Sequence, residues 1–231
     1  MPTRSNWPTP CDFRHERGVR GARCLLLNVV NTPPSQWASI VEADPEHSHR
    51  YAARFRQLEA QGTDIYGEAR LLDAMVERGS RVLDAGCGAG RSGGYLARQG
   101  HTVVGVDLDP VLIQASEEDF PGATWLVGDL AELDLPSRGI DEPFDAIVCA
   151  GNVMTFLHPA TRVTVLTRLG AHLADNGRAV VGFGAGRGYS FDAYAADVTR
   201  AGLRIDARFA TWDLRPFTGT SDFLVSLLSR A

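Results

Sequence analysis

The chain has 231 residues, of which 44% are hydrophobic and 22% are charged, and its formal net charge is −5. These values exclude a disordered or fibrous protein, and the length fits one large domain. The acidic balance argues against general nucleic-acid binding, which needs clustered Lys and Arg. The four cysteines lie far apart and form no C-x-x-C pair. We therefore expect a cytoplasmic protein with neither a metal site nor a disulfide framework.

Residues 1–44 are predicted to be a poorly ordered extension, because prolines recur there without hydrophobic periodicity. The apolar run at residues 24–30 is shorter than the roughly 20 residues that span a membrane. No small-residue cleavage site follows this run, so we expect neither a membrane anchor nor a secretory signal. The folded domain is predicted to cover residues 45–231.

Two helices are predicted at the start of this domain, over residues 49–58 and from residue 66 or 67 to residue 77. The aromatic residues Tyr51, Phe55 and Tyr66 lie in this region. They are candidates for a lid over a binding site, although apolar residues at helical spacing usually face a core. Both interpretations stay open on the sequence alone.

Short β-rich runs then alternate with segments that can form helices, which is the pattern of a parallel sheet wound with helices. These runs cover residues 81–85, 102–107, 123–127, 145–149 and 178–183. Near the end of the chain, two more runs have no helix between them, so we expect them to be antiparallel. They cover residues 204–213 and 222–229. The sequence thus predicts an α/β fold.

The strongest local signal is a glycine-rich turn at residues 82–91, VLDAGCGAGR, between the first strand and the next helix. Glycines let a backbone bend sharply and approach a ligand closely. The following helix directs free N–H groups and the positive end of its dipole toward that ligand. Asp107 ends the next strand, 21 positions after Gly86. This is near the spacing of about 20 for an acidic residue that accepts hydrogen bonds from ribose hydroxyls.

A dinucleotide-binding turn would have a third glycine at the position of Arg91. The observed pattern, D-x-G-x-G-x-G, instead resembles motif I of class I S-adenosylmethionine-dependent methyltransferases. The resemblance covers about residues 45–231, and segments 64–70 and 182–189 resemble small actinobacterial members with unassigned substrates. It implies a Rossmann-like, doubly wound sheet of seven strands in the order 3-2-1-4-5-7-6, with an antiparallel C-terminal strand. It also implies S-adenosylmethionine as cofactor.

The resemblance assigns roles to individual residues. It places Asp107 at the cofactor ribose, and we expect Asp107→Ala to weaken cofactor binding with little loss of fold. It places Asp129 near the adenine amino group, although Asp129 also suits the N-cap of a short helix that begins at Leu130. Leu108 lines the adenine face or belongs to the core. Asp84 accepts hydrogen bonds from the glycine turn, meets the cofactor ammonium, or only braces the turn.

Arg91 begins the helix after the turn, where a cation is poorly matched to the helix dipole. This predicts a bound carboxylate, such as that of the methionine moiety, with a solvated surface arginine as the alternative. Asn152 follows the fourth strand, at the edge where ligands bind in open α/β sheets, and is placed near the cofactor or the acceptor. The predicted cofactor-binding residues are Asp84, Gly86, Cys87, Gly88, Arg91, Asp107, Leu108, Asp129, Leu130, Ala150 and Asn152.

The expected reaction is methyl transfer to a small-molecule acceptor, because residues 150–153, AGNV, match neither the N/D-P-P-Y/F pattern nor a Pro-Cys nucleophile. Positioning can supply much of the acceleration, so a general base is optional. His158, Tyr189 and Asp192 are weak candidates for one. The alternatives are a non-catalytic S-adenosylmethionine-binding protein and a nicotinamide-dependent oxidoreductase. We expect a monomer or homodimer.

Overall fold

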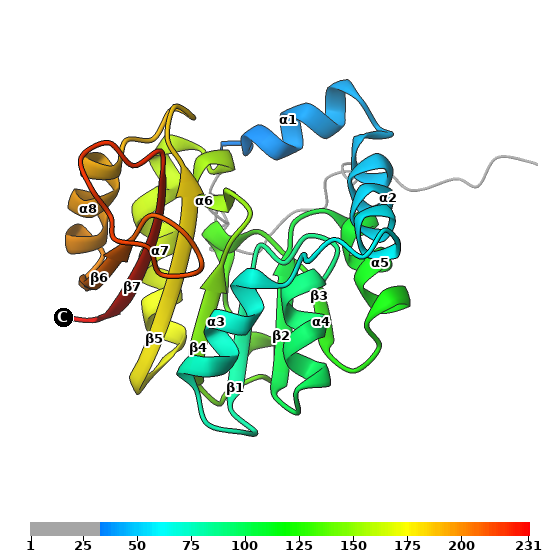
Figure 1. The fold of residues 1–231 in the computed structure, drawn as a ribbon, viewed down its shortest axis with the longest axis horizontal. Coiled ribbons are helices and arrows are strands. Elements are labelled where there is room, and N and C mark those ends of the chain that lie inside the picture. The colour runs from blue at the N-terminus through cyan, green and yellow to red at the C-terminus, as the bar shows by residue number, and fades with distance from the viewer. Residues whose placement is uncertain (1–32) are drawn as a thin grey trace, which may run out of the picture. The chain divides into compact units, whose positions relative to one another are not determined.

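This computed structural model describes residues 33–231 of the chain. Its central element is a seven-stranded sheet in the order β3-β2-β1-β4-β5-β7-β6 (Figure 1). Strands β1 to β5 are parallel, and β7 is antiparallel to both β5 and β6. The predicted fold and strand order are therefore confirmed. The strands are β1 (Arg81–Ala85), β2 (Thr102–Asp107), β3 (Thr124–Val127), β4 (Phe144–Cys149), β5 (Leu173–Gly184), β6 (Leu203–Phe209) and β7 (Phe223–Arg230).

Helices surround this sheet (Figure 1). Within residues 33–231, none of them is long and apolar enough to cross a membrane. The α-helices are α1 (Gln36–Ala43), α2 (His47–Ala60), α3 (Gly67–Met75), α4 (Arg91–Arg98), α5 (Pro110–Asp119), α6 (Val153–Phe156), α7 (Arg162–His172) and α8 (Phe191–Arg200). Short 3-10 helices are η1 (Leu130–Glu132), η2 (Pro136–Arg138) and η3 (Pro159–Thr161).

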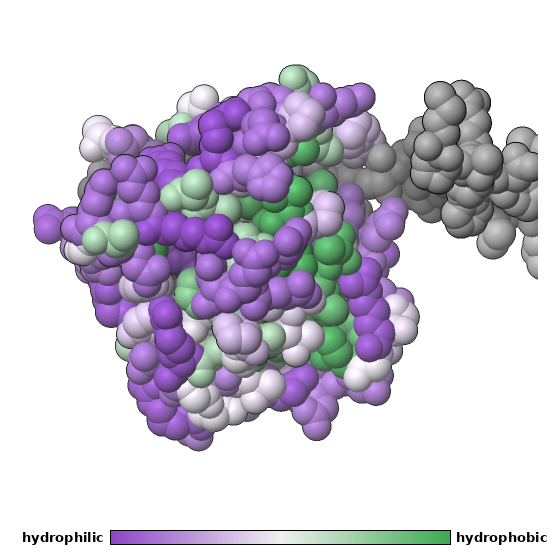
Figure 2. All heavy atoms as spheres, turned by 90° about the vertical axis from the view of Figure 1, so that its right-hand side faces the viewer, coloured by the Kyte–Doolittle hydropathy of each residue, from purple (hydrophilic) through white to green (hydrophobic). Residues whose placement is uncertain are grey.

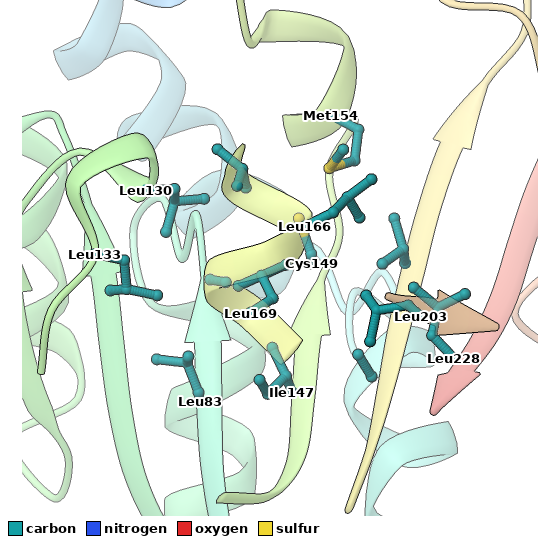
Figure 3. Packing of buried hydrophobic residues seen from close by; sticks show 14 of the residues in the cluster. Leu83, Leu130, Leu133, Ile147, Cys149, Met154, Leu166, Leu169, Leu203 and Leu228 are labelled. Carbon is teal, nitrogen blue, oxygen red and sulfur yellow. The ribbon is translucent and has the colours of Figure 1, made fainter. Parts of the chain in front are cut away.

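The central strands are hydrophobic on both faces because helices cover both. Successive strand residues point to opposite faces. Leu83 of β1 therefore belongs to a core with α7 and α8, where Leu166 and Leu169 of α7 lie against the strands (Figure 3). Its neighbour Val82 belongs to a second core with residues of α3 and α4. Each fully buried aliphatic side chain of this kind contributes about 1.5–3 kcal/mol.

The folded part of the chain begins before the boundary expected at residue 44, because residues 36–43 form helix α1. Ser35 caps this helix by accepting a hydrogen bond from the N–H of Ala38 at 3.1 Å, and Trp37 is buried. Figure 1 shows α1 above the carboxyl ends of the parallel strands. The helix is too short for a clear periodic signal, and it is held by contacts with distant residues. The rest of the predicted extension, residues 1–32, lies outside the described residues.

The side of the molecule that carries α2 and α5 is mostly hydrophilic, with a band of hydrophobic residues between hydrophilic segments (Figure 2). Among residues 33–231, only Val127 and Leu214 are large hydrophobic residues with exposed side chains. Val127 belongs to β3, the edge strand of the sheet.

Candidate functional site

The glycine turn after β1 adopts backbone conformations that favour glycine. Gly86, Gly88 and Gly90 have φ values of 78°, 55° and 75°, which lie in the left-handed region. A Cβ on Gly86 would also lie only 2.4 Å from Cγ2 of Val153 in α6. The Gly86 N–H donates to the carbonyl of Val106 at 2.8 Å. The turn therefore bends tightly between β2 and α6.

Asp107 lies at the carboxyl end of β2 and is only 9% exposed. Its Oδ2 accepts a hydrogen bond from the Gly88 N–H at 2.8 Å, and its Oδ1 accepts one from the Asp109 N–H at 3.0 Å. Burial raises the pKa of Asp107 to about 6. An ionised carboxylate offers about four acceptor positions, so two hydrogen bonds leave capacity for ligand hydroxyls. The same residue thus supports the turn and faces the cavity beside it.

Asp84 is the second buried carboxyl group, 3% exposed at the end of β1. Its Oδ2 accepts a hydrogen bond from the N–H of Gly93, in the first turn of α4, at 2.8 Å. Burial raises the pKa of Asp84 to about 7. Of the three predicted roles, the structure shows the brace, although its partner is a helix residue and not a turn glycine. Asp84 also lines a small recess beside the main cavity.

The predicted cofactor-binding residues come together at the carboxyl ends of β1, β2, β3 and β4. The main cavity is lined by seven of them, Gly86, Gly88, Asp107, Leu108, Asp129, Leu130 and Ala150. The small recess beside it adds Asp84, Cys87 and Arg91. Asn152 lines a further cavity that shares residues with both. Because parallel strands end at one edge of the sheet, residues from four separate segments meet there.

Asp129, Leu130 and Leu108 each combine a structural position with a place in the cavity. Asp129 is the N-cap of η1 and accepts a hydrogen bond from the Ala131 N–H at 2.8 Å. Leu130 is buried in the core that α7 covers. Leu108 packs against the cluster that contains Trp37. For Asp129 and Leu108, the sequence left open a structural role and a cofactor-site role, and the two roles are compatible with each other.

Arg91 is neither a solvated surface residue nor an unpaired cation. Its guanidinium forms two hydrogen bonds with the Glu68 carboxylate, at 2.7 and 2.8 Å, and another with the carbonyl of Ile65. It also lies 5.2 Å from the centre of the Phe55 ring. The carboxylate predicted beside Arg91 is thus supplied by Glu68 of α3, which sequence reasoning did not identify. A salt bridge between segments 23 residues apart carries no local sequence signal.

Cys87 and Asn152 have mainly structural contacts. Cys87 is buried in a cluster with Ile113 and Trp125, and burial raises the pKa of its thiol. Asn152 has a left-handed backbone with φ of 68°. Its Oδ1 accepts a hydrogen bond from the Gly184 N–H at 2.8 Å. Asn152 therefore connects the turn after β4 to the end of β5.

The three candidates for a general base do not line the cavities at this edge of the sheet. His158 is the N-cap of η3, and its Nδ1 accepts a hydrogen bond from the Ala160 N–H at 3.2 Å. Tyr189 is buried, and its hydroxyl donates to Asp197 at 2.7 Å. Asp192 is exposed in the first turn of α8. Capping and core contacts account for the positions of His158 and Tyr189.

An aromatic cap over the main cavity is formed by Trp37, Tyr51 and Phe156, of which the sequence suggested only Tyr51. The Trp37 ring makes edge contacts with Tyr51 and Phe156, with centroid distances of 5.4 and 5.6 Å. Trp37 Nε1 donates to Asp109 Oδ2 at 2.8 Å, and the Ser48 hydroxyl donates to the same oxygen. Asp109 therefore fastens both α1 and α2 to the end of β2.

Two of the three residues proposed for a lid lie at the cavities. Tyr51 and Phe55 line cavities at the carboxyl edge of the sheet. Tyr66 does not line them, because its hydroxyl is engaged with Glu59 and Arg98. Trp37 was missed because it belongs to the segment that the sequence predicts to be poorly ordered.

Comparison with known proteins agrees with this geometry. Residues 82–177 match a family described as a methyltransferase domain. The chain is 51% identical to a TehB-like SAM-dependent methyltransferase from Corynebacterium glutamicum, with a TM-score of 0.77, over 81% of this chain and 100% of that one. It is 33% identical to magnesium-protoporphyrin O-methyltransferase of Rhodobacter capsulatus, over 60% of this chain and 59% of that protein.

A more distant likeness is to the 18S rRNA (guanine-N(7))-methyltransferase of Mus musculus, 29% identical over 38% of this chain and 32% of that protein. The matched region thus spans less than two thirds of both curated relatives. The fold, the glycine turn and the extent of the Corynebacterium match together show that the chain belongs to the class I S-adenosylmethionine-dependent methyltransferases. The cofactor of this family is S-adenosylmethionine.

The residues present fit this cofactor. Gly86 and Gly88 line the cavity and carry no side chain, so a ligand can approach the backbone of the turn closely. Asp107 faces the cavity with acceptor capacity for hydroxyl groups. Leu108, Leu112 and Leu130 provide apolar surface in the same cavity, which suits a purine ring. The site therefore combines the polar and apolar surfaces that an adenosyl group needs.

Proposed function

We propose that this protein transfers a methyl group from S-adenosylmethionine to a small-molecule acceptor, with the residues collected above as the cofactor site. One observation carries the proposal: a cavity of about 470 Å³ lies next to the cofactor cavity and shares Tyr51, Gly151 and Phe156 with it. This volume is within the range of about 300–1,000 Å³ that is typical of small-molecule sites. An acceptor in this cavity reaches the cofactor past the shared residues.

When bound, S-adenosylmethionine supplies an electrophilic methyl group on a sulfonium. The contribution of this chain is to hold the acceptor lone pair in line and to exclude water, which can account for much of the rate. Tyr51 lies between the two cavities, and burial raises the pKa of its hydroxyl. This hydroxyl is therefore protonated at neutral pH and serves to orient the acceptor. It is not positioned here as a base.

The acceptor class rests on the cavity and on charge. The two curated relatives are named for a porphyrin and for an rRNA guanine, so their names favour no single acceptor. The net charge of −5 favours a small molecule over RNA, because RNA binding relies on clustered basic residues. We also propose that the protein acts in the cytoplasm.

The test is the transfer of a labelled methyl group from S-adenosylmethionine to a panel of hydroxyl, amine and carboxyl acceptors. Parallel calorimetric titrations with S-adenosylhomocysteine and NADH provide the control. We expect micromolar binding of the adenosyl ligand, silence with NADH, and label in at least one product. Adenosyl binding without label in any product would indicate a non-catalytic binding protein. Binding of NADH alone would indicate an oxidoreductase.

A further inference from the structure

The acidic side chains that line the acceptor cavity form ion pairs with arginines of this chain. The cavity contains two carboxylates, Asp64 and Glu68. Glu68 is neutralised by Arg91 through two hydrogen bonds, and Asp64 is neutralised by Arg70, with both contacts at 2.6 Å. The acidic residues of the cavity are therefore already compensated by this chain, and they provide no reason to expect a cationic acceptor.

Arg54 of α2 lines the same cavity and is exposed. It forms neither a hydrogen bond nor an ion pair with any residue in the described range 33–231. Arg56, two positions later on the same helix, is by contrast held by Glu118 and Asp119 of α5. The guanidinium of Arg54 is thus available to a ligand at the mouth of the cavity.

Arg187, in the loop after β5, is a second unpaired cation on this side of the sheet. Its Nε lies 3.5 Å from the position that a Cβ on Gly184 would take, and Asn152 Oδ1 lies 3.6 Å from the same position. Because Asn152 lines the acceptor cavity, Arg187 lies next to that cavity. Within the described part of the chain, Arg187 also has no ion-pair or hydrogen-bond partner.

Three aromatic side chains line the same cavity, Tyr51, Phe55 and Phe156. The rings of Tyr51 and Phe55 have their centroids 5.0 Å apart. Aromatic walls favour ring systems through stacking and edge contacts. Guanidinium groups favour carboxylate and other oxyanions through paired hydrogen bonds.

We propose that the acceptor cavity selects an aromatic anion, whose ring lies among Tyr51, Phe55 and Phe156 and whose acidic group contacts Arg54 and Arg187. This inference rests on the proposed function, because it names the substrate class of the acceptor site. The two arginines take no part in the methyl transfer itself. They bind the acidic group and thereby orient the atom that receives the methyl group.

The test compares 2-naphthoate with its neutral analogue 2-naphthamide, each titrated into the full chain saturated with S-adenosylhomocysteine and followed by ligand-observed NMR. We expect 2-naphthoate to bind at least fivefold more tightly. In Arg54→Gln and Arg187→Gln, this advantage should fall at least threefold, while the affinity for 2-naphthamide stays unchanged. Arg208→Gln is the matched control, because Arg208 is exposed on β6, has no hydrogen-bond or ion-pair partner among residues 33–231, and does not line the cavity.

Equal binding of the two probes, binding of neither, or the same loss in Arg208→Gln would overturn the proposal. Weaker binding of both probes in the arginine variants would also overturn it, because it would indicate a general change in the cavity. Failure of the proposed function gives a different result. In that case either S-adenosylhomocysteine fails to bind, which the cofactor titration shows before either probe is added, or it binds and the methyl-transfer assay yields no labelled product.

Discussion

The cofactor side and the acceptor side of this site are built in different ways. On the cofactor side, the turn after β1 and the end of β2 are shaped by backbone conformation and by hydrogen bonds between neighbouring segments. On the acceptor side, α2, α3, α4, α6 and the loops after β4 and β5 contribute side chains from distant parts of the chain. The first kind of site is a property of the fold, and the second is a property of the individual sequence.

The largest effect is expected from Gly86→Ala, which tests whether the cofactor side depends on backbone shape. The new Cβ would overlap Val153 and would need a left-handed backbone. We expect the free energy of unfolding to fall by about 2–4 kcal/mol. Chemical denaturation measures this loss, and titration with S-adenosylhomocysteine should show no measurable binding.

Gly202→Ala is the matched control for this variant. Gly202 has φ of 75°, but a Cβ there would have no atom within 4 Å. The free energy of unfolding should therefore fall only by the strain of placing alanine in a left-handed backbone, about 1–2 kcal/mol, and cofactor affinity should be unchanged. Equal losses in the two variants would show that the contact with Val153 does not matter.

Asp107→Ala is expected to have the next largest effect. The sequence predicted weaker cofactor binding with little loss of fold, but the structure shows a buried carboxylate that accepts hydrogen bonds from Gly88 and Asp109. Leaving those N–H groups without an acceptor should cost about 1–3 kcal/mol of stability. Affinity for S-adenosylhomocysteine should fall at least tenfold. Exposed Asp192→Ala should change neither quantity, and an unchanged stability of Asp107→Ala would contradict this account.

Trp37→Phe tests whether the cap belongs to the cofactor side. The variant keeps an aromatic ring but loses the N–H that donates to Asp109. Loss of one such hydrogen bond costs about 1 kcal/mol, so we expect about fivefold weaker binding of S-adenosylhomocysteine by calorimetry. Trp212→Phe is the control, because Trp212 does not line the cofactor cavity. An unchanged affinity in Trp37→Phe would remove the cap from the cofactor site.

A smaller effect is expected from pH. Burial raises the pKa of Asp107 to about 6, and ribose hydroxyls donate to the ionised form. If only that form binds well, affinity for S-adenosylhomocysteine should fall about fourfold between pH 7.5 and pH 5.5. Asp107→Asn should lose most of this dependence. The raised pKa has the opposite sign for stability, because the contribution of Asp107 falls as pH rises from about 4 to 7.

His158→Ala is expected to have the smallest effect. Its side chain caps η3 and does not line the site. We expect cofactor affinity and methyl transfer to remain within about twofold of the unchanged protein. A large loss of turnover with intact binding would return His158 to the list of catalytic candidates.

The same contrast explains what could be predicted from sequence. The parallel strands follow from regular β-α alternation, and the strand order and the meeting of Gly86, Asp107 and Asp129 were implied by the resemblance that the glycine motif carries; the structure shows all three. The pairing of Arg91 with Glu68 and the contact of Trp37 with Asp109 could not be predicted. Each joins residues distant in the chain, and neither leaves a periodic pattern or a characteristic spacing.

The position of Asp109 has a consequence for how the cap moves. One carboxylate oxygen holds Trp37 of α1 and Ser48 of α2, while the other caps α5. Two helices with a shared attachment point have little means of detaching separately, so α1 and α2 should form one cooperative opening unit. Their amide hydrogens should then exchange with solvent at a common rate. Substitution of Asp109 should accelerate that rate in both helices at once, leaving the central strands protected.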